Sequence, residues 1–322
     1  MNEDVLRNFS RVLAVQLAVV QQHFIHVLML RAWGEEAAAE RITSIDAIDL
    51  PNAMRIVDYV VSTGNVPTLA SDHRTLAGDL PGPGDGLNTV WAAERKLEYR
   101  MGNVLASVEW ELTPYRRNVP IELVTVPLEG RAAYRDWLRQ QSEHPREEVG
   151  RGGLTDPAQL GLDSLFAHLM VMINQTLVHA FVHWHRGEFD VADSVWEMSG
   201  AAMMHATSIV NSLAPRHVAP DPASAVVQGH AALPSVAAAS ADALRNERLL
   251  AERCRAAAQS AAIVQQEAGL AIACGRIEAY YGELIGWRPG QALPELENPC
   301  VDFERVHREY VRNGNAGSAS SA

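Results

Sequence analysis

Apolar residues recur at intervals of three or four positions along most of this chain, with polar residues between them. That period places the apolar side chains on one face of an α-helix. In the first long segment the members of this face are Val12, Val15, Val19, Phe24, Val27 and Leu30. The alternation of β-branched and polar residues that is typical of a strand does not persist anywhere in the sequence. The pattern therefore predicts an all-α fold.

The same period predicts four helices in each half of the chain, separated by segments rich in proline and glycine. The first four are expected at about residues 5–32, 35–62, 88–111 and 128–141. The other four are expected at about residues 162–186, 189–213, 236–260 and 261–286. In each half a long connection separates the second helix from the third. This is the connectivity of a four-helix bundle with one crossover.

The two halves are related by an internal duplication. Residues 20–34, VQQHFIHVLMLRAWG, align without a gap on residues 173–187, INQTLVHAFVHWHRG, at an offset of 153. The same offset carries other separated segments onto one another: Gln22 onto Gln175, His26 onto His179, Ile56-Val57 onto Ile209-Val210, and Glu94-Arg95 onto Glu247-Arg248. Because several segments share one offset, the sequence predicts two copies of one helical unit.

The duplication also predicts the domain boundaries. We expect a first bundle over residues 1–145, a linker over 146–161 and a second bundle over 162–312. Each bundle is long enough to bury a core of its own. The last residues, 313–322, read NGNAGSASSA, and this composition is typical of a disordered tail.

Composition and net charge indicate which classes of partner this protein is expected to bind. The 322 residues carry a formal net charge of −12, whereas a nucleic-acid footprint or an anionic membrane requires a basic surface. A membrane span over residues 12–30 is not expected, because Gln16, Gln21, Gln22, His23 and His26 interrupt that stretch. The acidic N-terminus and the absence of cysteine spacing typical of a disulfide framework indicate a cytoplasmic protein. We expect a small-molecule substrate, no nucleic-acid or membrane partner, and a homodimer as a possible assembly.

Three segments resemble the helices of bacterioferritins. LAVQLAVVQQHFIHVLMLRAWG resembles their first helix, NAMRIVDYVVSTGNVP their second and ERKLEYRMGNVL their third. The resemblance implies two tandem ferritin-like four-helix bundles that pack as a pseudo-dimer. It also implies a di-iron centre, in which two helices each supply a glutamate and two others each supply Glu-x-x-His.

The implied iron ligands are mostly replaced in this chain. Carried over position by position, they fall on Gln16, Asp49, Asn52 and Glu98 in the first half, and the fourth-helix pair falls near residues 128–131 without recognisable ligands. In the second half they fall on Leu169, Ala202, His205 and Ala251. The methionine positions that hold haem between subunits in the family fall on Leu50 and Met203, so symmetric bis-methionine ligation is not expected.

The first half therefore keeps a polar interior, and the second is mainly an apolar scaffold. We expect His23, Asp49 and Glu98 to serve as acid/base groups or as ligands of a remodelled metal site, and Gln16, Asn52 and Tyr59 to line a substrate cavity. Structural interpretations stand beside these roles. Asp49 precedes Leu50-Pro51 and suits a helix N-cap, His23 suits a hydrogen-bonded core histidine, and Glu94 suits an ion-pair network because it recurs as Glu247. A second candidate metal site combines His183, Glu197 and His205.

The resemblance implies an enzyme that acts on a small organic molecule, as an oxygenase or oxidase that depends on iron. The first alternative is a metal-free acid/base catalyst without a cofactor, such as a cyclase, isomerase or lyase. The second is a non-catalytic helical binding or scaffold protein whose altered ligand positions are relics.

Overall fold

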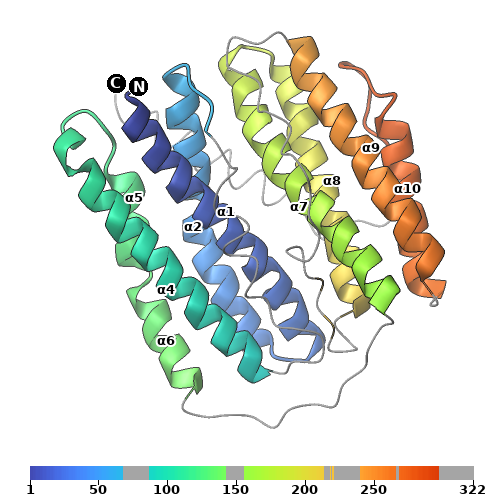
Figure 1. Ribbon diagram of the computed structural model, residues 1–322, viewed down its shortest axis with the longest axis horizontal. Coiled ribbons are helices and arrows are strands. Elements are labelled where there is room, and N and C mark those ends of the chain that lie inside the picture. Colours follow the sequence, from blue (N-terminus) through green and yellow to red (C-terminus); the bar gives the residue numbers. More distant parts are fainter. Residues whose placement is uncertain are drawn as a thin grey trace.

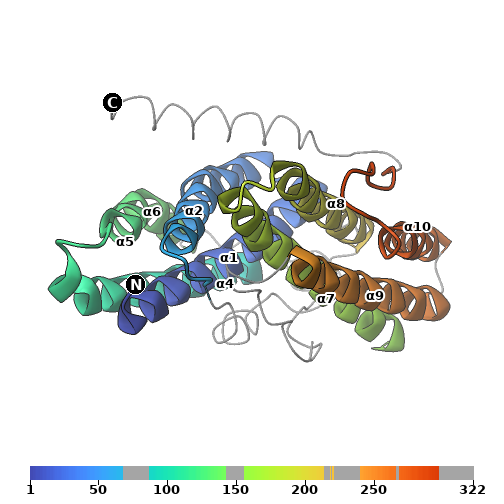
Figure 2. The same ribbon diagram turned by 90° about the horizontal axis from the view of Figure 1, so that it is seen from above.

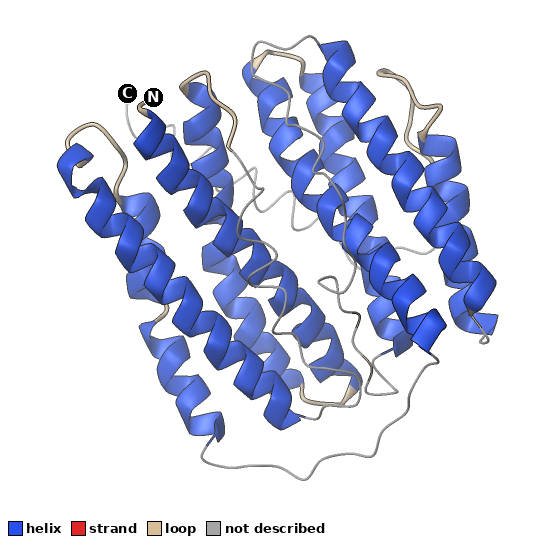
Figure 3. Cartoon of the chain, viewed as in Figure 1, coloured by secondary structure: helices blue, strands red, loops and turns tan. Residues whose placement is uncertain are grey.

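The regular structure of this protein is helical throughout the described ranges (Figure 3). The computed structural model describes residues 1–67, 87–142, 156–213, 218, 220, 240–265 and 268–296. The helices of the first half are α1 (Glu3–Ala32), α2 (Glu36–Ser62), α4 (Leu87–Leu112), the 3-10 helix η1 (Thr113–Tyr115), α5 (Glu122–Gly130) and α6 (Ala132–Ser142). The helices of the second half are α7 (Asp156–His185), α8 (Phe189–Leu213), α9 (Ser240–Val264) and α10 (Ala268–Leu284). The prediction of an all-α fold is confirmed.

Several predicted boundaries differ from the observed ones. The helices predicted at 236–260 and 261–286 are α9 and α10, which begin four and seven residues later. The single helix expected over 128–141 is replaced by α5 and α6, which meet at Arg131. Helix α7 begins at Asp156, inside the range assigned to the linker. The predicted tail over 313–322 lies outside the described residues, as does the end of the second predicted bundle.

In each half the first helix packs against the second and third helices, and the last helices pack against the third (Figures 1 and 2). In the first half α1 contacts α2 and α4, while α5 and α6 pack against α4. In the second half α7 contacts α8 and α9, while α10 packs against α9. The halves meet where α1 contacts α8 and where α2 contacts α7. These two contacts are reciprocal, because the duplication makes α1 the counterpart of α7 and α2 the counterpart of α8.

The cores of the two halves interlock at this junction. Part of α1 belongs to the core of the second half, through Ile25, Leu28 and Met29. Part of α7 belongs to the core of the first half, through Val178, Phe181 and Val182. The two sets are related by the offset of 153, so equivalent positions of α1 and α7 are each buried in the core of the other half. Burying each large apolar side chain contributes about 1.5–3 kcal/mol.

The turns that end α1 and α7 repeat one another in detail. Gly34 and Gly187, which are 153 positions apart, have φ of 78° and 77°. After α1 the amide of Glu35 donates to the carbonyl of Leu30 at 2.8 Å, and after α7 the amide of Glu188 donates to the carbonyl of His183 at 3.0 Å. This is the Schellman pattern, in which glycine takes the left-handed conformation that other residues adopt only with strain.

Two helices are long and apolar enough to cross a membrane by length and composition alone. The segments Glu3–Ala32 and Pro157–His185 reach mean hydropathies of 1.6 and 1.5, and 83% and 89% of their most apolar windows are buried against other helices. A central helix of a bundle passes the same test, because neighbouring helices cover it on several sides.

Candidate functional site

Buried polar and charged side chains gather inside the first half, between α1, α2, α4 and the turn that joins α5 to α6. Helix positions three, four or seven apart face the same way, and this spacing directs several side chains of each helix toward one interior. The members with at most 4% of their surface exposed are Gln16, His23, His26, Asp49, Asn52, Glu94, Glu98 and Arg131. Asp46 on α2 and Tyr134 on α6 complete the cluster through hydrogen bonds to His23 and Glu94.

Arg131 lies at the centre of one part of this cluster. Its side chain is 1% exposed, and its two terminal nitrogens donate separately to Asp49 Oδ2 on α2 and Glu98 Oε1 on α4. Burial acts to lower the pKa of Arg131, but the two carboxylates outweigh it and raise the pKa above the ordinary value. The guanidinium is therefore a permanent cation held between two carboxylates of different helices.

His23 and Glu94 organise the other part. His23 Nδ1 donates to Asp46 Oδ1 at 2.6 Å, and His23 Nε2 lies 3.1 Å from Glu94 Oε2. Glu94 also accepts hydrogen bonds from His26 Nδ1 and from the Tyr134 hydroxyl, the latter at 2.7 Å. Burial acts to lower the pKa of His23, but the carboxylates of Glu94 and Asp46 raise it well above its ordinary value. Burial raises the pKa of Asp46 to about 6, and because the two groups share a hydrogen bond they titrate as a pair.

The cluster carries more negative than positive charge. Four carboxylates, those of Asp46, Asp49, Glu94 and Glu98, face the single permanent cation of Arg131. Their formal sum is −3 when both histidines are neutral and −1 when both are protonated. Buried charge is costly unless it is compensated, so the composition of the cluster favours a further cation.

Several buried atoms of the cluster lack a hydrogen-bond partner among the described residues. They are Gln16 Nε2, His23 Nε2, His26 Nε2, Asn52 Oδ1, Asp49 Oδ1, Glu98 Oε2 and Arg131 Nε. Native proteins leave few such atoms without a partner, and those that remain commonly face water, an ion or a ligand. Because these atoms lie around the charged cluster, they indicate a polar non-protein occupant there.

Three residues of the cluster have the arrangement of a metal site. One ligand atom each from His23, Asp46 and Asp49 lies within 4.8 Å of the others. Imidazole and carboxylate are groups that iron, manganese and zinc accept. The cluster therefore fits one divalent ion. It does not fit the two irons that the family resemblance implies, because Arg131 is placed between Asp49 and Glu98, and Gln16 and Asn52 are neutral.

The predicted site residues of the first half are only partly brought together. Asn52 Nδ2 donates to Gln16 Oε1 at 3.2 Å and to the carbonyl of Leu123 at 2.7 Å. Tyr59 packs against Phe9, with ring centroids 5.2 Å apart, and makes no described contact with the cluster. The interpretation of Asp49 as an N-cap is wrong, because α2 runs through it and includes Pro51.

The alternative metal site is not assembled in this structure. His183 Nδ1 donates to Glu188 Oε2 at 2.6 Å, at the end of α7. Glu197 is exposed, and His205 packs against Tyr280 and Tyr281. Among the described residues the metal-like grouping occurs around His23 and not around these three side chains.

Sequence reasoning missed two central residues, and for each the chain held a signal. Asp46 lies three positions before Asp49 and therefore shares its helix face. Arg131 falls in the segment 128–131, which supplies no recognisable metal ligand but does supply a cation. Glu94 was interpreted as structural because it recurs as Glu247. Its pairing does recur, since His26 donates to Glu94 and His179 donates to Glu247.

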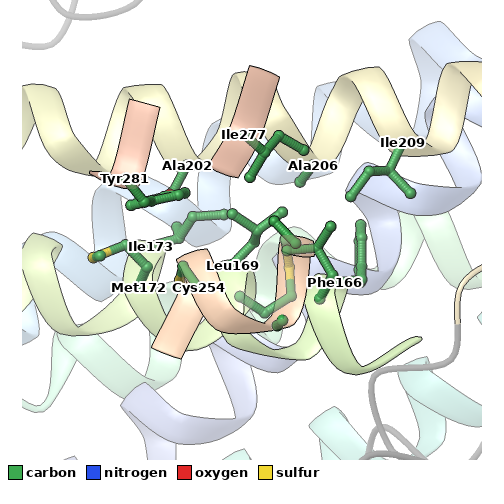
Figure 4. Close-up of a cluster of buried hydrophobic side chains, with 14 of the residues drawn as sticks. Phe166, Leu169, Met172, Ile173, Ala202, Ala206, Ile209, Cys254, Ile277 and Tyr281 are labelled. Carbon is green, nitrogen blue, oxygen red and sulfur yellow. The ribbon is translucent and has the colours of Figure 1, made fainter. Parts of the chain in front are cut away.

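The corresponding interior of the second half is apolar. Leu169 and Ala202 replace Gln16 and Asp49, and they lie among Phe166, Met172, Ala206, Ile277 and other packed side chains (Figure 4). His205 takes the place of Asn52 and is 9% exposed. The second half thus keeps the His–Glu pair of the first but neither of the carboxylates that hold Arg131.

A further cavity of about 70 Å³ lies at the junction of the halves. Pairs of positions related by the duplication line it. These pairs are Leu17 with Met170, Val20 with Ile173, Gln21 with Asn174, Phe24 with Leu177, and Leu50 with Met203. The structure therefore brings Leu50 and Met203 to one cavity. Bis-methionine haem does not fit it, because Leu50 has no atom that can bind iron.

His205 makes the stability of the second half depend on pH. Burial lowers its pKa from 6.5 to about 4, so the unfolded state binds a proton in this range that the folded state does not. Stability is then complete above about pH 6.5 and falls as the pH decreases toward 4, by about 3 kcal/mol. The variant His205→Asn, which restores the residue type of the first half, should reduce this pH dependence by that amount in urea unfolding at pH 7 and pH 4. Equal pH dependence in the two proteins would contradict the prediction.

Comparison with known proteins leaves the family open. No protein-family model matches the chain, and no curated protein is significantly similar to it. The likeness to bacterioferritins therefore rests on the helical segments of this chain.

Proposed function

We propose that the first half binds one divalent metal ion between His23, Asp46 and Asp49, and that the protein is a metal-dependent oxidoreductase acting on a small organic molecule. The observation that carries this proposal is the grouping of three ligand atoms within 4.8 Å inside a cluster that has excess negative charge. The unpartnered Asp49 Oδ1 supports it, because a buried carboxylate oxygen needs a cation or a donor.

The proposed architecture is two ferritin-like bundles packed as a pseudo-dimer. The reciprocal contacts of α1 with α8 and of α2 with α7 support it, as do the equivalent residues that interlock the two cores. The first bundle carries the site, and the second supplies a stable partner surface. This division explains why the first bundle alone has carboxylates at positions 49 and 98, whose equivalents in the second bundle are Ala202 and Ala251.

The residues around the metal positions have distinct roles. His23, Asp46 and Asp49 bind the ion, while Glu94 orients the imidazole from its other nitrogen and Arg131 fixes Asp49. Such outer partners hold ligands in a binding geometry. When bound, iron would supply oxygen activation and electron transfer. The side chain of Asp46 is 21% exposed, whereas that of His23 is fully buried, so Asp46 marks the side from which an ion enters.

The cavity at the junction is the proposed position of the organic substrate. Its lining is mainly apolar, which suits a small apolar molecule. Leu50 contributes to this lining and directly follows Asp49 on α2. The two proposed sites therefore lie on neighbouring faces of the same helix.

A metal-free acid/base catalyst is the second candidate, and the hydrogen-bond network favours it. Asp46, His23, Glu94 and Tyr134 form a continuous path of close contacts from a partly exposed carboxylate to a buried phenol. Two of its links are hydrogen bonds, and the third is the 3.1 Å ion pair between His23 Nε2 and Glu94 Oε2. A carboxyl group whose pKa is about 6 exchanges protons readily near neutral pH. In this case the same residues would move a proton to or from the substrate.

The metal content of the purified protein separates the two candidates. We expect about one ion per chain after growth with iron or manganese, measured by inductively coupled plasma mass spectrometry. The isosteric variant Asp46→Asn should weaken binding by at least about tenfold, because it removes an anionic ligand. Glu197→Gln is the matched control in the second half and should bind like the wild type.

The other outcomes are equally informative. If Glu197→Gln loses the metal and Asp46→Asn retains it, the metal site would be assigned to His183, Glu197 and His205 instead. Absence of metal from the wild type under all supplied ions would overturn the metal proposal and leave the acid/base network as the better explanation.

A further inference from the structure

The bridge made by Arg131 has the form of a metal site in which a guanidinium replaces the ion. We infer that Asp49 and Glu98 are a latent second cation site, closed by Arg131, and that removal of this side chain opens it to a divalent metal. The inference is separate from the proposed site at His23 and Asp46, although Asp49 belongs to both.

The geometry supports this inference in two ways. First, the two carboxylates come from different helices, α2 and α4, and meet on one cation, as ligands of a shared metal ion do. Second, each carboxylate uses one oxygen for Arg131, and its other oxygen, Asp49 Oδ1 or Glu98 Oε2, has no described partner. Asp49 is 0% exposed and Glu98 is 3% exposed. Removal of the guanidinium would also free Asp49 Oδ2 and Glu98 Oε1. A cation that replaces it would then have both oxygens of Glu98 and Oδ2 of Asp49, even where Asp49 Oδ1 binds the ion of the proposed site.

The donor set suits a hard divalent ion. Asn52 lies three positions after Asp49, and its Oδ1 also lacks a described partner. Two carboxylates and an amide oxygen are typical ligands of Mn²⁺ and related ions. A guanidinium differs from a metal ion because it cannot leave the site. Arg131 is covalently attached and cannot dissociate, so the charge of Asp49 and Glu98 is compensated whatever the supply of metal.

Charge balance gives the expected stoichiometry. Without Arg131 the four carboxylates of the cluster carry a formal charge of −4 when the histidines are neutral. Two divalent ions would neutralise that charge, whereas one ion and Arg131 leave the wild type with a formal charge of −1. The guanidinium therefore restricts the first half to a single metal ion. The second half agrees with this link between the carboxylates and their cation. Both carboxylate positions are alanine there, Ala202 and Ala251, and both lie in an apolar core.

The test compares metal binding by the whole protein and by Arg131→Ala. Both proteins are stripped with chelator, titrated with Mn²⁺, and measured by equilibrium dialysis and by thermal unfolding. We expect the variant to bind about one more ion per chain than the wild type, and its melting temperature to rise more on addition of Mn²⁺. Arg131→Lys keeps the cation and should gain no ion, and Arg131→Ala combined with Glu98→Ala should also gain none.

If Arg131→Ala is folded and binds no more Mn²⁺ than the wild type, the inference is overturned. If the metal-free variant is unfolded, recovery of its helical circular dichroism on addition of Mn²⁺ supports the inference, and failure to recover overturns it. A wild type that binds no ion beside a variant that binds one would contradict the proposed function alone.

Discussion

Replacing Arg131 with leucine is expected to lower the free energy of unfolding by about 3–5 kcal/mol when metal is absent. The change leaves Asp49 and Glu98 buried without their cation, and removal of one member of a buried ion network has a cost of this size. Urea unfolding at pH 7 in the presence of chelator measures it. Arg139→Leu is the matched control. Arg139 pairs with Asp136 at the surface, where its side chain is 71% exposed, so its loss should change stability by less than about 1 kcal/mol.

The triple variant Asp49→Ala, Glu98→Ala and Arg131→Leu should recover most of the lost stability. Apolar replacements of a whole buried ion group are often neutral or stabilising, because the desolvation of all its charges is removed together. The second half provides the natural precedent, since Ala202 and Ala251 occupy the carboxylate positions there and are fully packed. A triple variant no more stable than Arg131→Leu would show that the ion group stabilises the fold. In that case Arg131 would be explained by its contribution to stability, and less well by a role in restricting the number of bound metal ions.

The helices could be predicted from sequence because their signals are local. Helix α8 has the predicted bounds, 189–213, and the glycines that end α1 and α7 stand at equivalent positions. The fourth helix of the first half was predicted as one segment, because apolar spacing does not show where a chain turns between two short helices. Arg131 occupies that turn.

The site was harder to predict, because its contacts join helices that are distant in sequence. Gln16, His23, Asp49, Asn52 and Glu98 were expected to face one interior, and all are buried in the first half. Their partners were not foreseen, because a pattern of ligand positions does not show which counterion a carboxylate has. Two carboxylates without a full set of metal ligands still require a cation, and this requirement would have indicated Arg131. Tyr59 shares the helix of Asp49, yet helix spacing alone did not show that it packs against Phe9.

Truncation of Glu94 is expected to cost about 3–5 kcal/mol, roughly twice the cost of the equivalent change at Glu247. Glu94 is fully buried and contacts three groups, His23, His26 and Tyr134, whereas Glu247 accepts from His179. Each buried donor left without an acceptor costs about 1–3 kcal/mol. Urea unfolding of Glu94→Ala and Glu247→Ala at pH 7 measures both costs in one protein.

The pH dependence of the unfolding free energy of these two variants shows whether Glu94 stabilises the protein through its charge or through packing. Burial acts to raise the pKa of Glu94, but His23 and His26 outweigh it and lower the pKa below its ordinary value of 4.5. A lowered carboxyl pKa gives stability that is present above pH 4.5 and is lost as the pH falls toward the lowered value. The difference between wild type and Glu94→Ala should therefore shrink in acid. If the two truncations cost the same at pH 7, the contacts of Glu94 with His23 and Tyr134 would contribute nothing beyond the duplicated His–Glu pair. The asymmetry between the halves would then lie in Arg131 and its two carboxylates.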